Sequence, residues 1–138
     1  MTIPDALREQ VAERASRQCE YCLLHDQDAL MPHEADHIRP LKHHGATALD
    51  NLAYACFRCN RRKGTDIAGY DGETGRLTPL FNPRLDHWSQ HFVLESGLIR
   101  PLTATGRVTV DLLGLNLAER VEERLALAEL GRYPRKTP

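Results

Sequence analysis

The sequence lacks any long apolar stretch. No run of about 18 apolar residues, the length that crosses a bilayer as a helix, occurs in it. The N-terminal segment MTIPDALREQVAERASRQ is charged and has no apolar core of the kind found in secretory signals. We therefore expect a protein with no membrane contact and a cytoplasmic location. The length of 138 residues suits one compact domain.

A strong charge imbalance is also absent, since the formal net charge is −1. This value alone does not indicate a nucleic-acid binder, but the charges are unevenly distributed. Between His37 and Gly64 the only acid is Asp50, whereas six basic side chains lie there: Arg39, Lys42, Arg58, Arg61, Arg62 and Lys63. Such a local basic face can hold a phosphate backbone even when the total charge is near zero. The alternative is an ordinary solvated face.

Cysteine is absent except in two short segments, CEYC at residues 19–22 and CFRC at residues 56–59. In a reducing compartment, paired cysteines favour a metal site over disulfides. A two-residue gap lets both thiolates of a pair face one ion, and two such pairs supply the four ligands of a tetrahedral structural zinc. A redox motif needs one pair only. We therefore predict a structural zinc, with these ligands: Cys19, Cys22, Cys56 and Cys59.

The 33 residues between the two pairs predict a folded insert, because they exceed the usual spacing of a zinc ribbon. A zinc with four thiolate ligands has no open position, so any chemistry must come from this insert. Asp36 and the amide of Asn60 offer the hard oxygen ligands that suit Mg²⁺ or Mn²⁺. His37 beside such an ion can deprotonate a water for attack on phosphorus. Neighbouring strand residues point to opposite faces, so the strand must bend or end at Asp36-His37.

The rest of the pattern is typical of an α+β protein. Helical periodicity and capping residues predict a last helix that begins at Asn116, ends at Gly131 and is followed by a frayed tail. Its apolar stripe is expected to pack on the core or on a partner, and comprises Leu117, Val121, Leu125 and Leu127 or Ala128. A helix is also expected at 4–17, an extended segment at 33–38 and a short helix that ends at Gly64. A long loop should follow at 65–85, and then a hairpin at 91–102 that turns at Ser96-Gly97. The segment that begins at 103 is expected to be capped by Thr103.

Together, the motifs DHI, LDNL and CNRRKG, framed by the two CxxC pairs, resemble the HNH endonuclease family with its ββα-metal core. The likeness is specific from Cys19 to Thr65, because the order of all these motifs is kept. The segments PLFNPRLDHWSQHF and LTATGRVTVDLLGLN further resemble one bacterial branch of small HNH proteins. The resemblance covers most of residues 19–116.

The resemblance implies a role for each matching residue. Asp36 is similar to the first ligand of the catalytic metal, and His37 is similar to the general base. Asn51 is similar to the central Asn, which braces the loop and helps orient the base through backbone contacts. Asn60 stands where a final His is often found, and its amide oxygen favours Mg²⁺ or Mn²⁺ over a transition metal. The four cysteines match the structural zinc ligands.

The implied activity is that of a hydrolase that cleaves phosphodiester bonds in nucleic acid, with DNA as the favoured partner. We expect one HNH domain over 1–138, with a zinc-framed ββα core at 19–66 and a C-terminal extension at 79–131. The alternative is a zinc-stapled nucleic-acid-binding module without catalysis. The joint presence of Asp36, His37 and Asn60 favours the enzyme, because binding alone needs none of them.

A toxin or effector nuclease is a third and less favoured reading, since no delivery segment is seen. His43 and His44 are expected to be exposed loop residues. Trp88, His91 and Phe92 are expected to pack on the ββα core, with His91 hydrogen-bonded, and no catalytic role is assigned to His87 or His91. The sequence indicates neither a sequence preference nor an oligomeric state.

Overall fold

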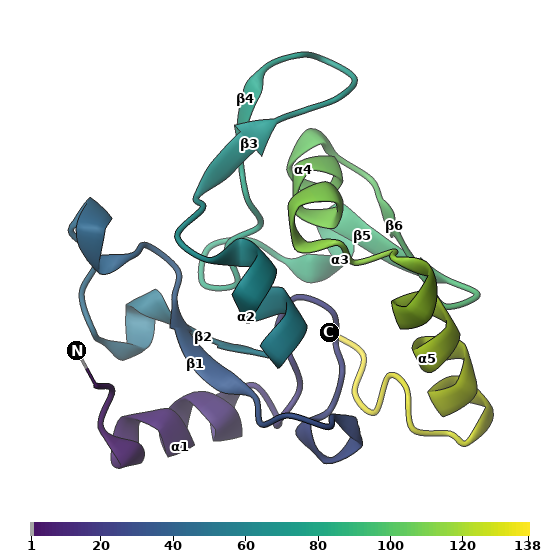
Figure 1. Cartoon of the computed structure of the whole chain (residues 1–138), viewed down its shortest axis with the longest axis horizontal. Coiled ribbons are helices and arrows are strands. Elements are labelled where there is room, and N and C mark those ends of the chain that lie inside the picture. The colour runs from purple at the N-terminus through teal and green to yellow at the C-terminus, as the bar shows by residue number, and fades with distance from the viewer. Residues whose placement is uncertain (1) are drawn as a thin grey trace.

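Three antiparallel hairpins and five α-helices make up the computed structural model, which describes residues 2–138 (Figure 1). The hairpins pair β1 (Glu34–His37) with β2 (Leu52–Ala55), β3 (Ala68–Tyr70) with β4 (Leu77–Pro79), and β5 (Phe92–Glu95) with β6 (Leu98–Pro101). The helices are α1 (Asp5–Arg14), α2 (Phe57–Lys63), α3 (Trp88–His91), α4 (Ala104–Leu113) and α5 (Ala118–Glu129). Short 3₁₀ turns lie at Asp26–Asp28, Leu41–His43 and Leu49–Asn51. None of the helices in residues 2–138 is long and apolar enough to cross a membrane.

The central unit consists of the β1–β2 hairpin followed directly by α2. Glu34 pairs with Ala55 and His37 with Leu52 across the hairpin. β2 is buried along its whole length, whereas every residue of β1 keeps some exposure. Gly64, with a φ of +50°, ends α2 in a conformation that favours glycine. The expected ββα core is therefore confirmed, as is the helix end at Gly64.

Two clusters of buried side chains surround this unit. In the smaller cluster, Val11 and Ala12 of α1 pack on Leu52 and Tyr54 of β2. The larger cluster contains Cys19, Cys22, Cys56 and Cys59. We call these four residues alone the cysteine cluster. Side chains from the later part of the chain complete the larger cluster, namely Leu80, Phe81, Trp88, Phe92, Ile99, Val108, Leu113, Leu115 and Tyr133. The segments after residue 79 are thus built around the cysteine cluster.

Local signals placed two C-terminal features correctly. The β5–β6 hairpin turns at Ser96 and Gly97, whose φ values are 51° and 83°. Positive φ at both central residues is the geometry of a tight two-residue hairpin loop. Thr103 caps α4, because its hydroxyl accepts a hydrogen bond from the backbone N–H of Gly106.

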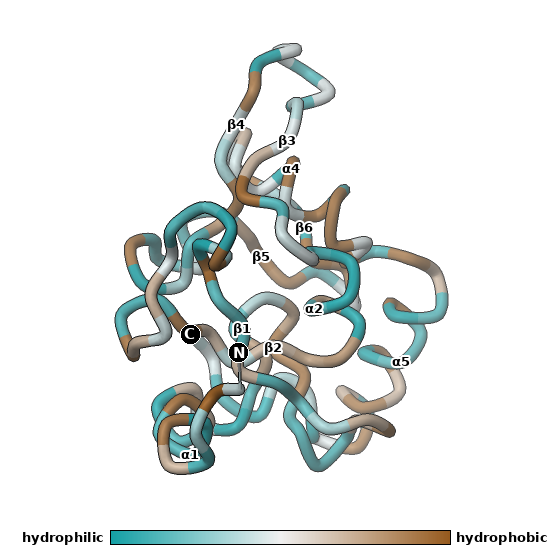
Figure 2. The backbone as a smooth tube through the Cα atoms, turned by 60° about the vertical axis from the view of Figure 1, so that its left-hand side comes forward, coloured by the Kyte–Doolittle hydropathy of each residue, from teal (hydrophilic) through white to brown (hydrophobic). Residues whose placement is uncertain are grey.

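The long loop expected at 65–85 is wrong, because this segment contains the β3–β4 hairpin. The hairpin projects from the body of the molecule, as the two views show (Figures 1 and 2). The start of its turn is fixed to α4 by the buried Asp71, whose carboxylate accepts hydrogen bonds from Nε and Nη2 of Arg107 at 2.8 and 2.9 Å. Asp71 also accepts from the backbone N–H and the hydroxyl of Thr74, which lies in the turn of the hairpin.

The expected details of the last helix also need correction. Leu117, not Asn116, occupies the N-cap of α5, and Asn116 instead exchanges two 2.9 Å hydrogen bonds with the backbone of Ile99. The predicted apolar stripe meets the core only in part, since Leu127 packs on the larger cluster whereas Leu117 and Leu125 are each 39% exposed. The buried residues of α5 are two arginines, Arg120 and Arg124. Gly131, with a φ of +71°, follows the end of the helix as expected.

The tail after Gly131 is not frayed. Tyr133 is buried, and its hydroxyl donates a 2.6 Å hydrogen bond to the carbonyl of Cys22. Arg135 forms an ion pair with Asp28 at 3.0 Å, and the backbone N–H of Lys136 donates to Gln18. The C-terminal segment therefore lies against the first cysteine pair.

We predict that Asp71→Asn lowers the stability of the protein at pH 7. The hydrogen bonds from Arg107, assisted by Thr74, hold the pKa of Asp71 well below its usual range despite burial. A lowered folded-state pKa gives stability that is present above the unfolded-state pKa of about 3.9 and is lost as the pH falls toward the folded-state pKa. The stability gap between wild type and Asp71→Asn should therefore shrink below about pH 4.

Urea unfolding at pH 7, 5, 4 and 3 measures this gap. Glu73→Gln is the matched control, because the mostly exposed Glu73 carboxylate lies 3.2 Å from the same Arg107 and should contribute little. A pH-independent difference between Asp71→Asn and wild type would contradict the prediction.

Candidate active site and metal centre

The sulfur atoms of the cysteine cluster converge on one point. They all lie within 4.8 Å of one another, and the sulfurs of Cys22 and Cys56 are 3.6 Å apart. All four cysteines are buried and none forms a disulfide. A tetrahedral zinc with Zn–S bonds of about 2.3 Å separates its sulfurs by about 3.8 Å, so the observed spacing fits this metal. The cluster thus has the ligands and the size of a structural zinc site.

The electrostatics of the cluster also favour a cation. Burial raises the pKa of the Cys19 and Cys59 thiols well above the ordinary value, whereas hydrogen bonds with the other cysteines, Cys19 first, hold the pKa of Cys22 well below it. Four thiolates so close together require a positive charge among them. Backbone N–H groups of Cys22 and Cys59 point toward the sulfurs of Cys19 and Cys56, each at 3.4 Å. A Zn²⁺ ion bound by the four sulfurs would supply this positive charge.

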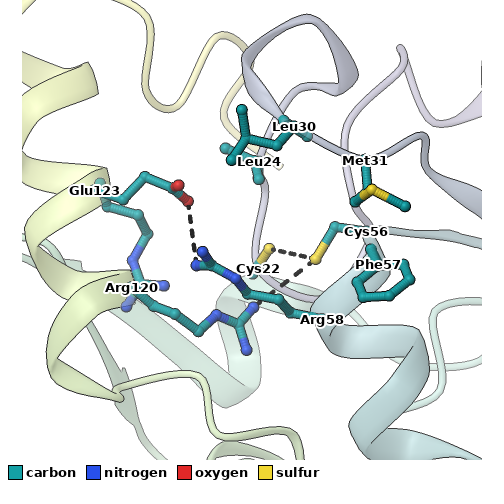
Figure 3. A pocket seen from close by; sticks show the side chains of 11 residues that line it. Cys22, Leu24, Leu30, Met31, Cys56, Phe57, Arg58, Arg120 and Glu123 are labelled. Atoms are coloured by element: carbon teal, nitrogen blue, oxygen red, sulfur yellow. Dashed lines mark hydrogen bonds and ion pairs between the residues drawn. The ribbon is translucent and has the colours of Figure 1, made fainter.

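A charged side chain also reaches the cluster from α5. Nη2 of Arg120 lies 3.0 Å from the sulfur of Cys59 and 3.9 Å from that of Cys56. Burial lowers the pKa of Arg120, but the neighbouring sulfurs raise this pKa by more, and the net shift is upward. Figure 3 shows the guanidinium directed from α5 toward Cys56. Sequence reasoning missed this residue, which lies 61 positions from Cys59.

Asp36 lies near the end of β1, where a buried lysine holds it. Its Oδ2 is 2.8 Å from Nζ of Lys63, and the side chain of Lys63 is 2% exposed. The same Nζ donates a 3.0 Å hydrogen bond to the carbonyl of His37. Burial raises the pKa of Asp36, and Lys63 opposes this shift. Lys63, expected to contact phosphate, instead joins the last turn of α2 to the end of β1.

His37 is the last residue of β1 and opens onto a cavity that it shares with Asp36. Its Nε2 lies 2.8 Å from the hydroxyl of Thr47, which holds the ring in one orientation. The cavity has a volume of about 260 Å³ and is lined by Asp36, His37, Pro40, Leu41, Lys42, Gly64 and Thr65. Because β1 ends here, two neighbouring residues can face one space.

Asn51 closes the loop that follows β1. Its Oδ1 accepts from the backbone N–H of Arg39 at 2.9 Å, and its Nδ2 donates to the carbonyls of Arg39 and Ala46 at 2.9 and 2.8 Å. Gly45 makes this closure possible, because a Cβ there would lie 1.7 Å from the carbonyl oxygen of Arg39 and 2.9 Å from Nδ2 of Asn51. The loop next to His37 is therefore fixed by the amide of Asn51 and by the close approach that glycine allows at position 45.

Asp36 and His37 share a cavity. Among the residues that the structure describes, 2–138, Asn60 of α2 is not part of the lining of this cavity. Its Nδ2 donates a short hydrogen bond to a carboxylate oxygen of Glu34. Glu34 lies two residues before Asp36 and therefore on the same face of β1. Sequence reasoning did not single out Glu34, although its spacing from Asp36 was a usable signal.

The basic residues of the insert and of α2 differ in their surroundings. Arg39, Lys42, Arg61 and Arg62 are exposed, and Lys42 lines the cavity of His37. The guanidinium of Arg61 lies over the ring of Phe57 at 5.0 Å. Arg58 lies 3.7 Å from Glu123 of α5, so part of its charge is balanced within the chain (Figure 3).

Residues 19–66 match the sequence profile of a family described as HNH endonuclease. We call residues 19–66 the HNH segment after this match. The HNH segment contains the cysteine cluster and every candidate catalytic residue: Asp36, His37, Asn51 and Asn60. Arg120 and Tyr133, which contact the cysteine pairs from the C-terminal part of the chain, lie outside the HNH segment.

Two curated proteins are similar to this chain. Septu protein PtuB of Bacillus thuringiensis is 27% identical over 111 residues, which cover 79% of this chain and 40% of that protein. Septu protein PtuA of Bacillus mycoides (strain KBAB4) is 32% identical over 100 residues, which cover 64% of this chain and 14% of that protein. The chain thus spans less than half the length of either relative. No solved structure matches the chain.

We predict that Gly45→Ala destabilises the protein by about 1–3 kcal/mol, the usual cost of forcing an extra group into a packed site. The added Cβ would displace the carbonyl of Arg39 and with it the hydrogen bonds of Asn51. Gly72→Ala is the control, because a Cβ at Gly72 meets nothing within 4 Å, and it should change stability by less than about 0.5 kcal/mol. Urea unfolding of the three proteins measures the difference; equal effects would contradict the close approach seen at Gly45.

We also predict that Asp36 and Lys63 are energetically coupled. Lys63→Met should cost about 3 kcal/mol, because removal of one partner leaves a buried charge uncompensated. Asp36→Asn leaves the buried ammonium of Lys63 in the same situation. The double variant should be more stable than the sum of the single effects implies, by about 1–3 kcal/mol. Urea unfolding of all four proteins completes the cycle, and simple additivity would show that the pair does not interact.

Proposed function

We propose that this protein is a metal-dependent endonuclease that hydrolyses phosphodiester bonds in nucleic acid, with DNA as the favoured substrate. The observation that carries the proposal is the placement of Asp36 and His37. Both residues belong to the HNH segment, and both line one open cavity at the end of β1. The surrounding elements are held from two sides, by Lys63 of α2 and by Asn51 of the following loop.

In this proposal His37 is the general base that takes a proton from the attacking water. Its contact with Thr47 fixes the ring, and the cavity gives it access to a substrate. Asp36 offers a carboxylate oxygen to Mg²⁺ or Mn²⁺ within the cavity, and Asn60, which lies outside the cavity lining, would add its amide oxygen from α2. The amide of Asn60 donates its N–H to Glu34, which directs the amide oxygen away from that carboxylate. A divalent ion held there supplies positive charge to the phosphate and lowers the pKa of a bound water.

The protein supplies few ligands for this ion. Outside the cysteine cluster, residues 2–138 contain no group of three or more His, Cys, Asp or Glu side chains close enough to hold a metal. Mg²⁺ commonly binds through one or two carboxylates, with waters and substrate phosphate in its other positions. The scarcity of protein ligands therefore favours Mg²⁺ or Mn²⁺ over zinc at Asp36.

Four exposed cations suit the backbone of a nucleic acid, and one of them, Lys42, lines the cavity. Arg39 and Lys42 belong to the loop that follows β1, and Arg61 and Arg62 lie on the helix that follows β2. We assign the phosphate contacts to these four residues first. Arg58 and Lys63 already face Glu123 and Asp36.

A binding module without catalysis is the second candidate, and one observation favours it. The carboxylate oxygen of Asp36 that would hold the ion lies 2.8 Å from the ammonium of Lys63. A site whose carboxylate keeps this partner permanently would hold nucleic acid without cleaving it.

We predict that the zinc-loaded protein cleaves supercoiled plasmid only when Mg²⁺ or Mn²⁺ is added, and that EDTA stops the cleavage. His37→Ala should reduce the rate by about 10²–10⁴-fold, the usual contribution of a general base. His43→Ala is the matched control, because His43 is an exposed histidine in the segment that follows β1 and its loss should leave the rate unchanged. Gel assays of nicked and linear product give the rates.

Circular dichroism and elemental analysis must show that His37→Ala keeps its fold and its zinc. Shifted DNA bands without product in Mg²⁺, Mn²⁺ and Ni²⁺ would support the binding module. Equal losses in His37→Ala and His43→Ala would contradict the role of His37.

A further inference from the structure

Two buried arginines lie on one face of α5, four residues apart. Arg120 is 3% exposed and Arg124 is 2% exposed. An arginine is almost never fully buried unless it is paired, because its charge must be compensated when it leaves water. The two residues therefore need hydrogen-bond partners inside the protein, and these partners differ between Arg120 and Arg124.

Arg124 bonds to oxygen atoms alone. Its Nε donates to the carbonyl of Gly97 at 2.7 Å, and its Nη2 donates to the carbonyl of Leu115 at 2.7 Å and to Oδ1 of Asn116 at 3.1 Å. These acceptors tie α5 to the β5–β6 turn and to the end of α4. Arg124 thus has a structural role that its neutral partners explain.

Arg120 divides its donors between oxygen and sulfur. Nη1 donates to the carbonyls of Leu113 and Gly114 at 2.8 and 3.2 Å. Nη2 turns the other way and reaches the sulfurs of Cys59 and Cys56 (Figure 3). The contact with Cys59, at 3.0 Å, is short for an N–H···S bond, as expected when the acceptor carries negative charge.

The charge of the metal centre explains why a cation is needed there. Four thiolates around one Zn²⁺ carry a formal charge of −2, and the site is buried. Backbone N–H groups within the two CxxC segments offset part of this charge at Cys19 and Cys56. Within residues 2–138, the guanidinium of Arg120 is the charged group whose hydrogen bonds reach these sulfurs.

We propose that Arg120 is the charge partner of the cysteine metal centre. Its guanidinium neutralises part of the negative charge on the zinc thiolates through Cys59 and so slows the loss of the metal. The same bond fastens α5, which lies outside the HNH segment, to the metal centre. The proposal depends on bound zinc and not on nuclease activity, so the two can fail separately.

Zinc retention in the full-length, zinc-loaded chain tests the proposal. Arg120→Gln is compared with Arg124→Gln, the matched control on the same face of α5. Loss of a hydrogen-bonding partner of a metal ligand typically costs 10–100-fold in metal affinity. We therefore expect zinc transfer to an excess of the chromophoric chelator 4-(2-pyridylazo)resorcinol to be at least about 10-fold faster from Arg120→Gln than from Arg124→Gln. Arg120→Lys, which keeps the charge, should recover part of the loss.

Cobalt substitution provides a readout that packing alone does not move. With Co²⁺ in the cysteine cluster, the sulfur-to-cobalt charge-transfer band reports the electron density on the sulfurs. Removal of a cation that bonds to Cys59 raises that density, so the band of Arg120→Gln should shift to longer wavelength. The band of Arg124→Gln should stay where it is in the wild type.

Equal zinc release from Arg120→Gln and Arg124→Gln, or an unshifted cobalt band in Arg120→Gln, would overturn the proposal. Should Arg120→Gln fail to fold, Arg120→Lys and Arg124→Lys replace it in both measurements. In that pair the proposal requires faster zinc release and a shifted band in Arg120→Lys alone, because only there is the bond to sulfur altered.

Discussion

The convergence of four cysteine sulfurs within 4.8 Å is the constraint on which the rest of the molecule depends. One pair comes from the segment after α1, and the other lies at the junction of β2 and α2. A metal that holds both pairs fixes where α2 begins and in which direction it runs. Since Lys63 lies at the far end of α2, this direction decides whether its ammonium reaches Asp36. The geometry of the candidate site is therefore set some distance away, at the cysteine cluster.

The C-terminal half attaches to the same place by polar bonds to backbone carbonyls. The indole N–H of Trp88 donates to the carbonyl of Tyr21 at 2.9 Å, and the hydroxyl of Tyr133 donates to that of Cys22 at 2.6 Å. Both acceptors lie within the CEYC segment. Because metal binding and folding are coupled in sites of this kind, these contacts would loosen together if the metal were lost. The HNH segment and the C-terminal helices are held by one common support.

Sequence patterns predicted the features that short-range chemistry dictates. The CxxC spacing, the glycine after α2, the Ser96-Gly97 turn and the Thr103 cap each depend on residues a few positions apart. The failures have the opposite origin. The local sequence predicts Asn116 as the cap of α5, but its side chain instead bonds to the backbone of Ile99 in β6, which lies 17 residues earlier. Arg120 and Arg124 appear as surface residues in any periodicity argument, because the acceptors that permit their burial are distant in sequence. The three-residue strands β3 and β4 are too short to show an alternating pattern.

The buried pair of Asp36 and Lys63 changes what metal binding at this site means. The carboxylate already has a cation, supplied by the chain itself, and so is compensated before any metal arrives. If Asp36 binds a divalent ion, as we propose, that ion would share the carboxylate with the ammonium of Lys63, which lies 2.8 Å from Oδ2. The measured affinity of the ion would then be the attraction between ion and carboxylate minus the attraction between carboxylate and ammonium. A weak measured affinity would therefore be compatible with a strong bond between the ion and Asp36. Lys63 would thus compete with the proposed metal for Asp36, and it compensates the carboxylate in the structure.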